Sequence, residues 1–104
     1  MLKQPSGSFE ASFHNVVITT TPKALIDLCA KYDINFYSCN DGKDKTNFDF
    51  EFESKDGVRF FVYDWKEYRQ LSLNENIEFH IGAKDKSESN KAYDVLMEEL
   101  NNLN

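Results

Sequence analysis

The segment from Phe48 to Trp65 constrains the fold most, because its side chains alternate with the two-residue period of a β-strand. Phe occupies positions 48, 50 and 52, and Asp or Glu occupies positions 49, 51 and 53. Four turn-forming residues follow at 54–57, and a second run rich in large apolar residues extends from Val58 to Trp65. Two such runs around a short turn are typical of a β-hairpin, so the chain is predicted to contain an antiparallel sheet.

Two registers of this hairpin are possible, and they expose different residues. A two-residue type I′ turn at Asp56-Gly57 would pair Lys55 with Val58, and it would place Asp49 opposite Asp64. The same register would gather the three Phe of the first strand with Phe61, Tyr63 and Trp65 on one face.

The second register uses a type I turn at Lys55-Asp56, with Gly57 in a left-handed bulge position. Ser54 then pairs with Val58, and Glu53 pairs with Arg59. We favour this register because it pairs opposite charges, whereas the first places two carboxylates together. It buries Phe60 and Val62 beside the Phe residues, and it leaves four residues on the opposite face: Arg59, Phe61, Tyr63 and Trp65.

Further elements are predicted on both sides of the hairpin. Ser8 to Thr20 alternates as a long strand, and Thr21-Pro22 combines an N-cap hydroxyl with a proline at the first position of a helix that ends near Tyr32. Short strands are expected at 34–39 and from Ile77 to Gly82. Asp85 and Glu88 have capping-box spacing ahead of a C-terminal helix whose apolar stripe is Ala92, Leu96, Leu100 and Leu103.

The predicted order is therefore β-α-β-β-β-β-α. Four consecutive strands with short connections favour antiparallel pairing, and two one-sided helices suit one face of a sheet. We predict an α+β two-layer sandwich, with a mostly antiparallel five-stranded sheet and both helices on one face. Residues 1–7 are expected to form a flexible N-terminal tail and residues 8–104 a single domain, which 104 residues with 40% apolar content can support.

Charge and composition exclude several classes of function. The net charge of −6 argues against general nucleic-acid binding, because phosphate contacts require a basic surface. Two cysteines, Cys29 and Cys39, are too few for a disulfide scaffold or a zinc site, so we expect free thiols and a cytoplasmic location. The loop at 40–45 does not match a calcium-binding loop, and four scattered glycines form no phosphate-binding motif; no cofactor or metal is expected. No apolar run is long enough to span a membrane.

Two places carry candidate chemistry. His80 lies two residues from Glu78 on the polar face of the fifth strand, where it could act as a general base, although a strand histidine hydrogen-bonded to a carboxylate is the commoner outcome. The segment from Tyr63 to Arg69 concentrates three aromatic and two basic residues, which suits either stacking on a ring beside a phosphate or a protein interface. The candidate binding residues are Arg59, Phe61, Tyr63, Trp65, Lys66, Tyr68, Arg69 and His80.

Two functions from different classes are consistent with these residues. The favoured one is a small, acidic, non-enzymatic binding protein, an inhibitor or adaptor that docks a protein partner through the aromatic hairpin face and could form a homodimer. Such domains are often met among phage and mobile-element proteins, which would place this one in the host cytoplasm; that association is an analogy. The alternative is a protein that binds or sequesters a small nucleotide-like ligand, or a minor hydrolase. Lys66 and Arg69 would then contact phosphate, with His80 and Glu78 as acid and base.

Overall fold

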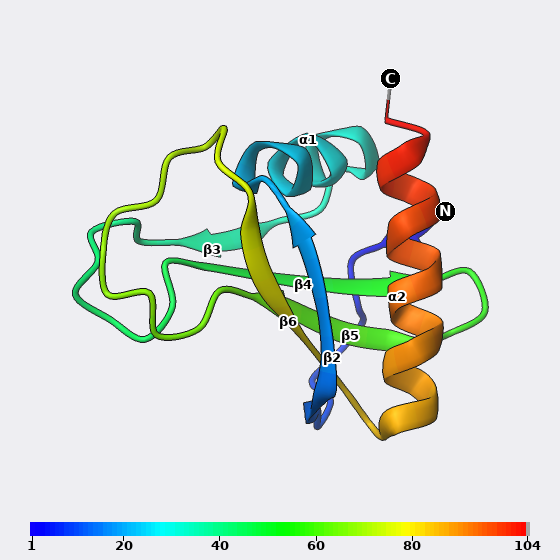
Figure 1. Ribbon diagram of the computed structural model, residues 1–104. Helices are drawn as coiled ribbons and strands as arrows, with labels where there is room; N and C mark the ends of the chain where they lie inside the picture. The colour runs from blue at the N-terminus through cyan, green and yellow to red at the C-terminus, as the bar shows by residue number, and fades with distance from the viewer. Residues whose placement is uncertain (104) are drawn as a thin grey trace.

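The computed structural model describes residues 1–103 and shows an antiparallel sheet with two helices (Figure 1). Neighbouring strands of the sheet follow the order β1-β4-β5-β6-β2, and β3 pairs with β4 beside β1. The predicted α+β arrangement is therefore confirmed, with six strands in place of five. The strands are Leu2–Lys3 (β1), Ser12–Thr20 (β2), Phe36–Ser38 (β3), Phe48–Ser54 (β4), Arg59–Tyr63 (β5) and Ile77–Ala83 (β6).

The two helices begin where the sequence predicts. Helix α1 (Pro22–Tyr32) is capped by Thr21, whose hydroxyl accepts a hydrogen bond from the backbone N–H of Ala24 at 3.1 Å. Helix α2 (Lys86–Asn101) is capped by Asp85, whose carboxylate accepts from the N–H of Glu88 at 2.8 Å. Both helices contribute to one core on the same side of the sheet, and Leu25, Leu28 and Leu96 are fully buried there.

The hairpin of β4 and β5 adopts the favoured register. Glu53 pairs with Arg59 and Glu51 with Phe61, while Gly57 has a φ of 86° in the left-handed region. The N–H of Ser54 donates to the carbonyl of Val58 at 2.9 Å, which closes the bulged turn. The apolar face of the hairpin is completely buried, as predicted, by Phe48, Phe50, Phe52, Phe60 and Val62.

The N-terminal prediction needs correction. Residues 1–7 were expected to form a tail outside the fold, but Leu2 is buried and β1 pairs antiparallel with the end of β4. A strand of two residues has no periodicity that a sequence could reveal. The next strand starts at Ser12 rather than Ser8, and its pairing with β6 shifts between Phe13 and Val17, where Asn15 has a φ of 63°.

Candidate binding surface

The sheet face that points away from the helices, which we call the open face, carries side chains from every strand. One row of directly opposed residues crosses five strands: Tyr37, Asp49, Tyr63, His80 and Val17. Because neighbours across an antiparallel sheet have Cβ atoms about 5 Å apart, these side chains lie against one another. The row places the candidate residues Tyr63 and His80 side by side.

Four rings on this face form what we call the aromatic patch: Phe13, Tyr63, Trp65 and His80. The His80 ring stacks on Phe13 with a centroid distance of 4.0 Å and meets Tyr63 at 5.5 Å. Trp65 lies 6.0 Å from Tyr63 and 6.3 Å from His80. Trp65 remains 41% exposed and Phe13 37%, so the patch is a surface and not a second core.

The other end of the open face is covered by the chain itself. Phe9 stacks on Phe61 with a centroid distance of 4.7 Å, and the Arg59 guanidinium lies 5.4 Å from the Phe9 ring. An open hollow of about 520 Å³ beside this pair is lined by Phe9 to Ser12, Phe61 and Lys84. The candidate residues Arg59 and Phe61 therefore contact the segment that precedes β2, and in the sheet Gly82 lies between Phe61 and Phe13 of the aromatic patch.

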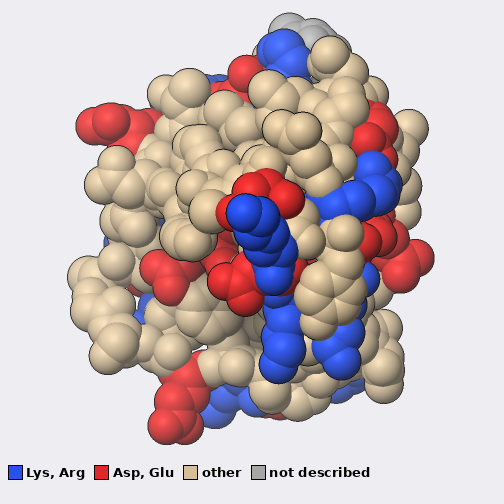
Figure 2. Space-filling model, turned by 90° about the vertical axis from the view of Figure 1, so that its left-hand side faces the viewer, with Lys and Arg blue, Asp and Glu red and all other residues tan. Residues whose placement is uncertain are grey.

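Two lysines flank the exposed Trp65. The ammonium of Lys45 lies 5.9 Å and that of Lys66 5.5 Å from the centroid of the Trp65 rings. Neither lysine forms an ion pair with a carboxylate of residues 1–103. The loops at 39–47 and 64–76 form one end of the molecule, which we call the loop end. Figure 2 looks at this end and shows Lys and Arg side chains near its centre with Asp and Glu around them.

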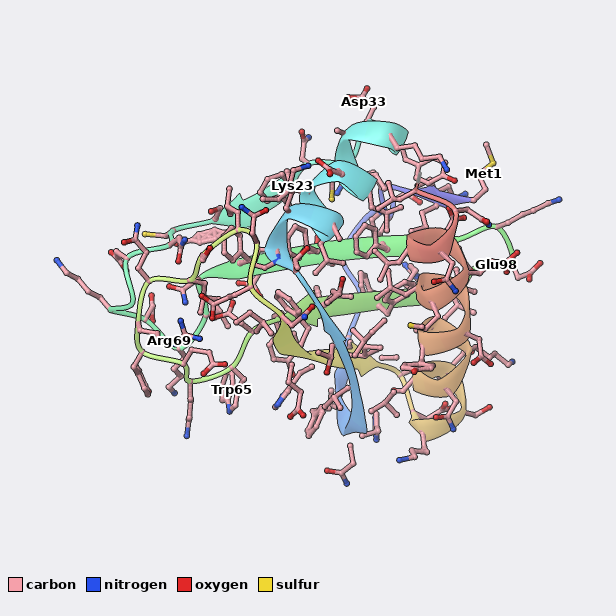
Figure 3. The ribbon with its side chains drawn as sticks, turned by 45° about the horizontal axis from the view of Figure 1, so that its top comes forward. Met1, Lys23, Asp33, Trp65, Arg69 and Glu98 are labelled. Carbon is pink, nitrogen blue, oxygen red and sulfur yellow. The ribbon has the colours of Figure 1, made fainter. Side chains whose placement is uncertain are left out.

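Arg69 is not directed at the aromatic patch. Its guanidinium forms an ion pair with Glu75, with Nη1 of Arg69 3.2 Å from Oε2 of Glu75, and this contact raises the pKa of Arg69 and lowers that of Glu75. Figure 3 shows that Trp65 and Arg69 both extend from the loop end of the sheet. Tyr68 is 55% exposed on the same loop.

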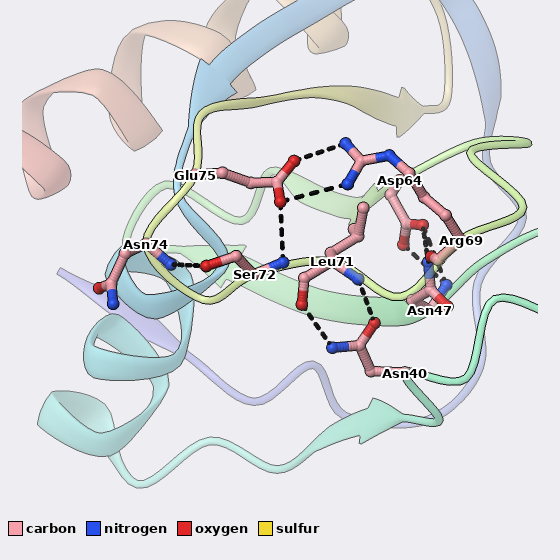
Figure 4. A network of polar contacts seen from close by, with 8 residues as sticks. All are labelled: Asn40, Asn47, Asp64, Arg69, Leu71, Ser72, Asn74 and Glu75. Carbon is pink, nitrogen blue, oxygen red and sulfur yellow. Dashed lines mark hydrogen bonds and ion pairs between the residues drawn. The ribbon is translucent and has the colours of Figure 1, made fainter.

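A group of buried polar contacts, which we call the loop clamp, holds this end of the sheet (Figure 4). The fully buried carboxylate of Asp64 accepts hydrogen bonds from the backbone N–H groups of Asn47 and Phe48 and from Nδ2 of Asn47, all at 2.8–3.0 Å. The Asn40 amide donates to the carbonyl of Leu71 and accepts from its N–H, both at 2.8 Å. The clamp therefore joins the loop at 39–47 to the loop at 64–76.

Close packing of the two backbones completes this arrangement. Gly42 has a φ of 75°, and a Cβ added there would lie 2.6 Å from the backbone of Arg69, so only glycine fits. The N–H of Lys66 donates to the carbonyl of Lys45 at 2.7 Å. Lys66 and Tyr68 have φ values of 56° and 51°, which are left-handed conformations that non-glycine residues adopt only where their surroundings enforce them.

The electrostatics of the open face follow from partial burial. Burial lowers the pKa of His80, and the nearby Glu78 only partly opposes this, so the imidazole is neutral at pH 7. Burial also raises the pKa of Asp49, although Thr46 donates a hydrogen bond to its carboxylate at 3.0 Å. Within residues 1–103, His80 has no hydrogen bond to a carboxylate, contrary to the commoner outcome expected from sequence, because its ring is stacked among aromatic side chains.

Several residues of this surface were missed by the sequence analysis. Phe13 was not among the candidates, because the pairing of β2 with β6 that brings it against His80 cannot be read from local sequence. Lys45, Asn47 and Asp64 were overlooked because an Asn- and Asp-rich loop resembles any solvated turn. The available signal in the sequence was the run of polar residues at 40–47 directly before the apolar Phe48.

Searches for similar proteins gave no family to which the chain could be compared. No protein-family model matched, and neither the curated proteins nor the solved structures contained a significant match. Among residues 1–103 there is no group of three or more His, Cys, Asp or Glu side chains that could hold a metal ion. None of the helices described is long and apolar enough to cross a membrane.

Proposed function

We propose that this protein is a small non-enzymatic binding protein, an inhibitor or adaptor, that docks a protein partner through the aromatic patch. One observation carries the proposal. The patch lies on the sheet face that no helix covers, and its largest side chain, Trp65, keeps 41% of its surface exposed. Trp and Tyr dominate the energetics of protein interfaces because they bury much apolar area with few rotatable bonds.

The rigidity of the loop end supports a binding role. Trp65 follows directly after Asp64, whose buried carboxylate is fixed by three donors, and it precedes Lys66, which is held in a left-handed conformation. A side chain that is already held in position loses little conformational entropy when it binds. Left-handed non-glycine residues also concentrate at functional sites, where the surrounding structure maintains them.

The patch supplies both kinds of contact that an interface needs. Phe13, Tyr63 and Trp65 provide a central apolar area, while Lys45 and Lys66 provide a charged rim beside Trp65. An apolar centre with a polar rim excludes water from the central contacts once a partner covers them. We therefore assign the anchoring role to Trp65 and the steering role to the two lysines.

The alternative, a small phosphorylated ligand, needs a different convergence of side chains. Trp65 and His80 do lie close together, but Arg69 is paired with Glu75. Native mass spectrometry of the freshly purified protein separates the two functions, because a sequestered nucleotide would be retained with it. A bound small molecule that disappears in Arg69→Ala would favour the ligand and contradict a purely protein-docking surface.

The experiment that tests the docking function compares three proteins as affinity baits: the wild type, Trp65→Ala and Tyr93→Ala. Tyr93 is a matched control, since it is 36% exposed but lies on α2, away from the open face. We expect a partner to be recovered in equal amounts with the wild type and with Tyr93→Ala and to be lost with Trp65→Ala. The unfolding midpoints of all three should stay close, because exposed aromatics contribute little to the isolated fold.

Recovery of the same partners with Trp65→Ala, or a strongly destabilised Trp65→Ala, would contradict this function. The partner that passes the comparison can then be purified and titrated at low and high salt. Because salt screens the charges of Lys45 and Lys66, association should be slower at high salt, whereas the apolar contact of Trp65 should persist.

The cellular location belongs to the same proposal. Cys29 and Cys39 are both free thiols, Cys29 on the buried side of α1 and Cys39 in the loop after β3. Free thiols are the usual state in a reducing compartment, so we place the protein in a cytoplasm. If it is a phage or mobile-element product, its partner would be a host protein there.

A further inference from the structure

Strand β2 forms one border of the sheet, and its outer edge pairs with no other strand of residues 1–103. The opposite border is formed by β1 and β3, which have only two and three residues, and such short edge strands offer little to pair with. A strand at the border of a sheet presents unpaired N–H and C=O groups that can bond to another chain. The outer edge of β2 is therefore a template for strand addition.

The composition of β2 is unusual for such an edge. Residues 11–22 contain no Asp, Glu, Lys or Arg, the longest such run in a chain whose charged content is 29%. Natural edge strands are normally blocked by lysine, by proline or by inward-pointing charges. The residues at 16–20 are instead Val, Val, Ile, Thr and Thr, which are β-branched and favour strand pairing.

Only the first part of β2 is blocked. The backbone shift between Phe13 and Val17 interrupts the pairing there, and Nζ of Lys86 donates a hydrogen bond to the carbonyl of His14 at 2.9 Å. Neither device reaches the residues from Val17 to Thr20, which pair regularly with β6. The available edge is thus the four residues from Val17 to Thr20.

We propose that a second copy of this chain pairs with that edge, so that β2 of the two copies run antiparallel and the two sheets become one. Two properties of β2 favour a second copy as the occupant: the strand carries no Asp, Glu, Lys or Arg, and it is complementary to itself when two copies run antiparallel. Each copy carries a net charge of −6, which opposes self-association over most of the surface, whereas the uncharged β2 permits close approach. An antiparallel pair of identical strands is also self-complementary, as a twofold interface requires.

This dimer would have a consequence for the open face, although the proposal does not depend on the proposed function. A twofold axis perpendicular to a continuous sheet leaves both open faces on the same side. The two aromatic patches would then flank the seam, since Phe13 belongs to β2 itself. A partner with two matching sites would gain affinity from both.

Size-exclusion chromatography with light scattering, over a wide range of protein concentrations, tests the proposal with two matched variants. Thr19→Lys adds a lysine to the β2 edge at an exposed position opposite Glu78, so the monomer should stay folded. Ser38→Lys adds the same charge to β3, on the opposite border. We expect a dimer for the wild type and for Ser38→Lys, and at least a tenfold weaker dimer for Thr19→Lys.

A spin-label distance measurement locates the seam without altering β2. A nitroxide at Glu78→Cys, in a Cys39→Ser background, lies one strand inside the edge, so two labels in the dimer should be within roughly 25 Å, since neighbouring strands are about 4.8 Å apart. A label at Lys55→Cys, in the turn between β4 and β5, should give a much longer distance. The spin-label distances also test the proposed β2 seam if Thr19→Lys does not fold.

Three results would overturn the proposal. One is a wild-type protein that stays monomeric at every concentration. Another is a dimer that resists Thr19→Lys but dissociates in Trp65→Ala, which would assign self-association to the aromatic patch. The last is a shorter distance between labels at Lys55→Cys than between labels at Glu78→Cys. Failure of the docking function leaves all three measurements unaffected, because none of them requires a partner.

Discussion

Removal of the Asp64 carboxylate should destabilise the protein through the loop clamp. The carboxylate accepts from the N–H groups of Asn47 and Phe48 and from Nδ2 of Asn47, and the side chain of Asp64 is fully buried. Asp64→Ala leaves the N–H groups of Asn47 and Phe48 without an acceptor, and it leaves Nδ2 of Asn47 with only the carbonyl of Arg69. Since an unsatisfied buried donor costs about 1 to 3 kcal/mol, we expect a loss of about 3 kcal/mol or more.

The loss should be visible both in stability and in the local environment of Trp65. For a domain of this size, 3 kcal/mol corresponds to a decrease in melting temperature of about 12 to 24 °C. Trp65 is the only tryptophan and adjoins Asp64 in sequence, so its fluorescence reports the clamp directly. Urea melts followed by fluorescence and by far-ultraviolet circular dichroism would separate opening of the loop end from global unfolding.

Asp94→Ala is the control, because Asp94 is exposed on α2 and belongs to no hydrogen bond or ion pair found in residues 1–103. Its effect should stay within about 0.5 kcal/mol, the range of ordinary surface substitutions. If Asp64→Ala also falls within that range, the donors must find other acceptors or water, and the clamp does not hold the loop end. The reasoning about a rigid Trp65 would then fail too.

Four other perturbations test separate parts of the structure. Leu96→Ala should cost about 2 to 4 kcal/mol in urea melts, because Leu96 is fully buried on α2 and truncation leaves a cavity. Gly42→Ala should be clearly more destabilising than Gly7→Ala, since both glycines have φ above 70° but only Gly42 contacts the backbone of Arg69. Alkylation under non-reducing conditions should label Cys39 quickly and Cys29 only on unfolding, as burial raises the pKa of the Cys29 thiol to about 12; a disulfide between them would contradict this. Burial lowers the pKa of His80 in the folded state, so the folded form binds fewer protons there and stability should fall as pH drops below about 6.5; His80→Phe should lose that part of the pH dependence in urea melts.

Local signals in the sequence were sufficient to predict the hairpin register and the starts of both helices. The opposed charges of Glu53 and Arg59 distinguished the correct hairpin register from the alternative. Thr21 and Asp85 marked the first turns of both helices because capping is chemistry between residues three apart. Such signals act within a few residues, so they can be read without knowing the fold.

The aromatic patch depends on contacts between residues far apart in the sequence, which local signals do not reveal. His80 and Phe13 are stacked because β6 is inserted between β5 and β2 in the sheet. The pairing joins segments far apart in the sequence, and neither segment alone specifies it. The sequence therefore identified Tyr63, Trp65 and His80 as candidates and could not supply Phe13, the ring against which His80 packs.

The loop after β5 shows why sequence proximity misleads at this surface. Trp65 and Arg69 lie four residues apart and were expected to act together on one binding surface. The left-handed residues Lys66 and Tyr68 turn the backbone between them. The chain is redirected toward Gly42, whose missing side chain admits the backbone of Arg69, and the Arg69 guanidinium then pairs with Glu75. Arg69 thus stabilises the loop that presents Trp65, and Lys45 from a separate loop lies beside the Trp65 rings although the sequence analysis did not select it.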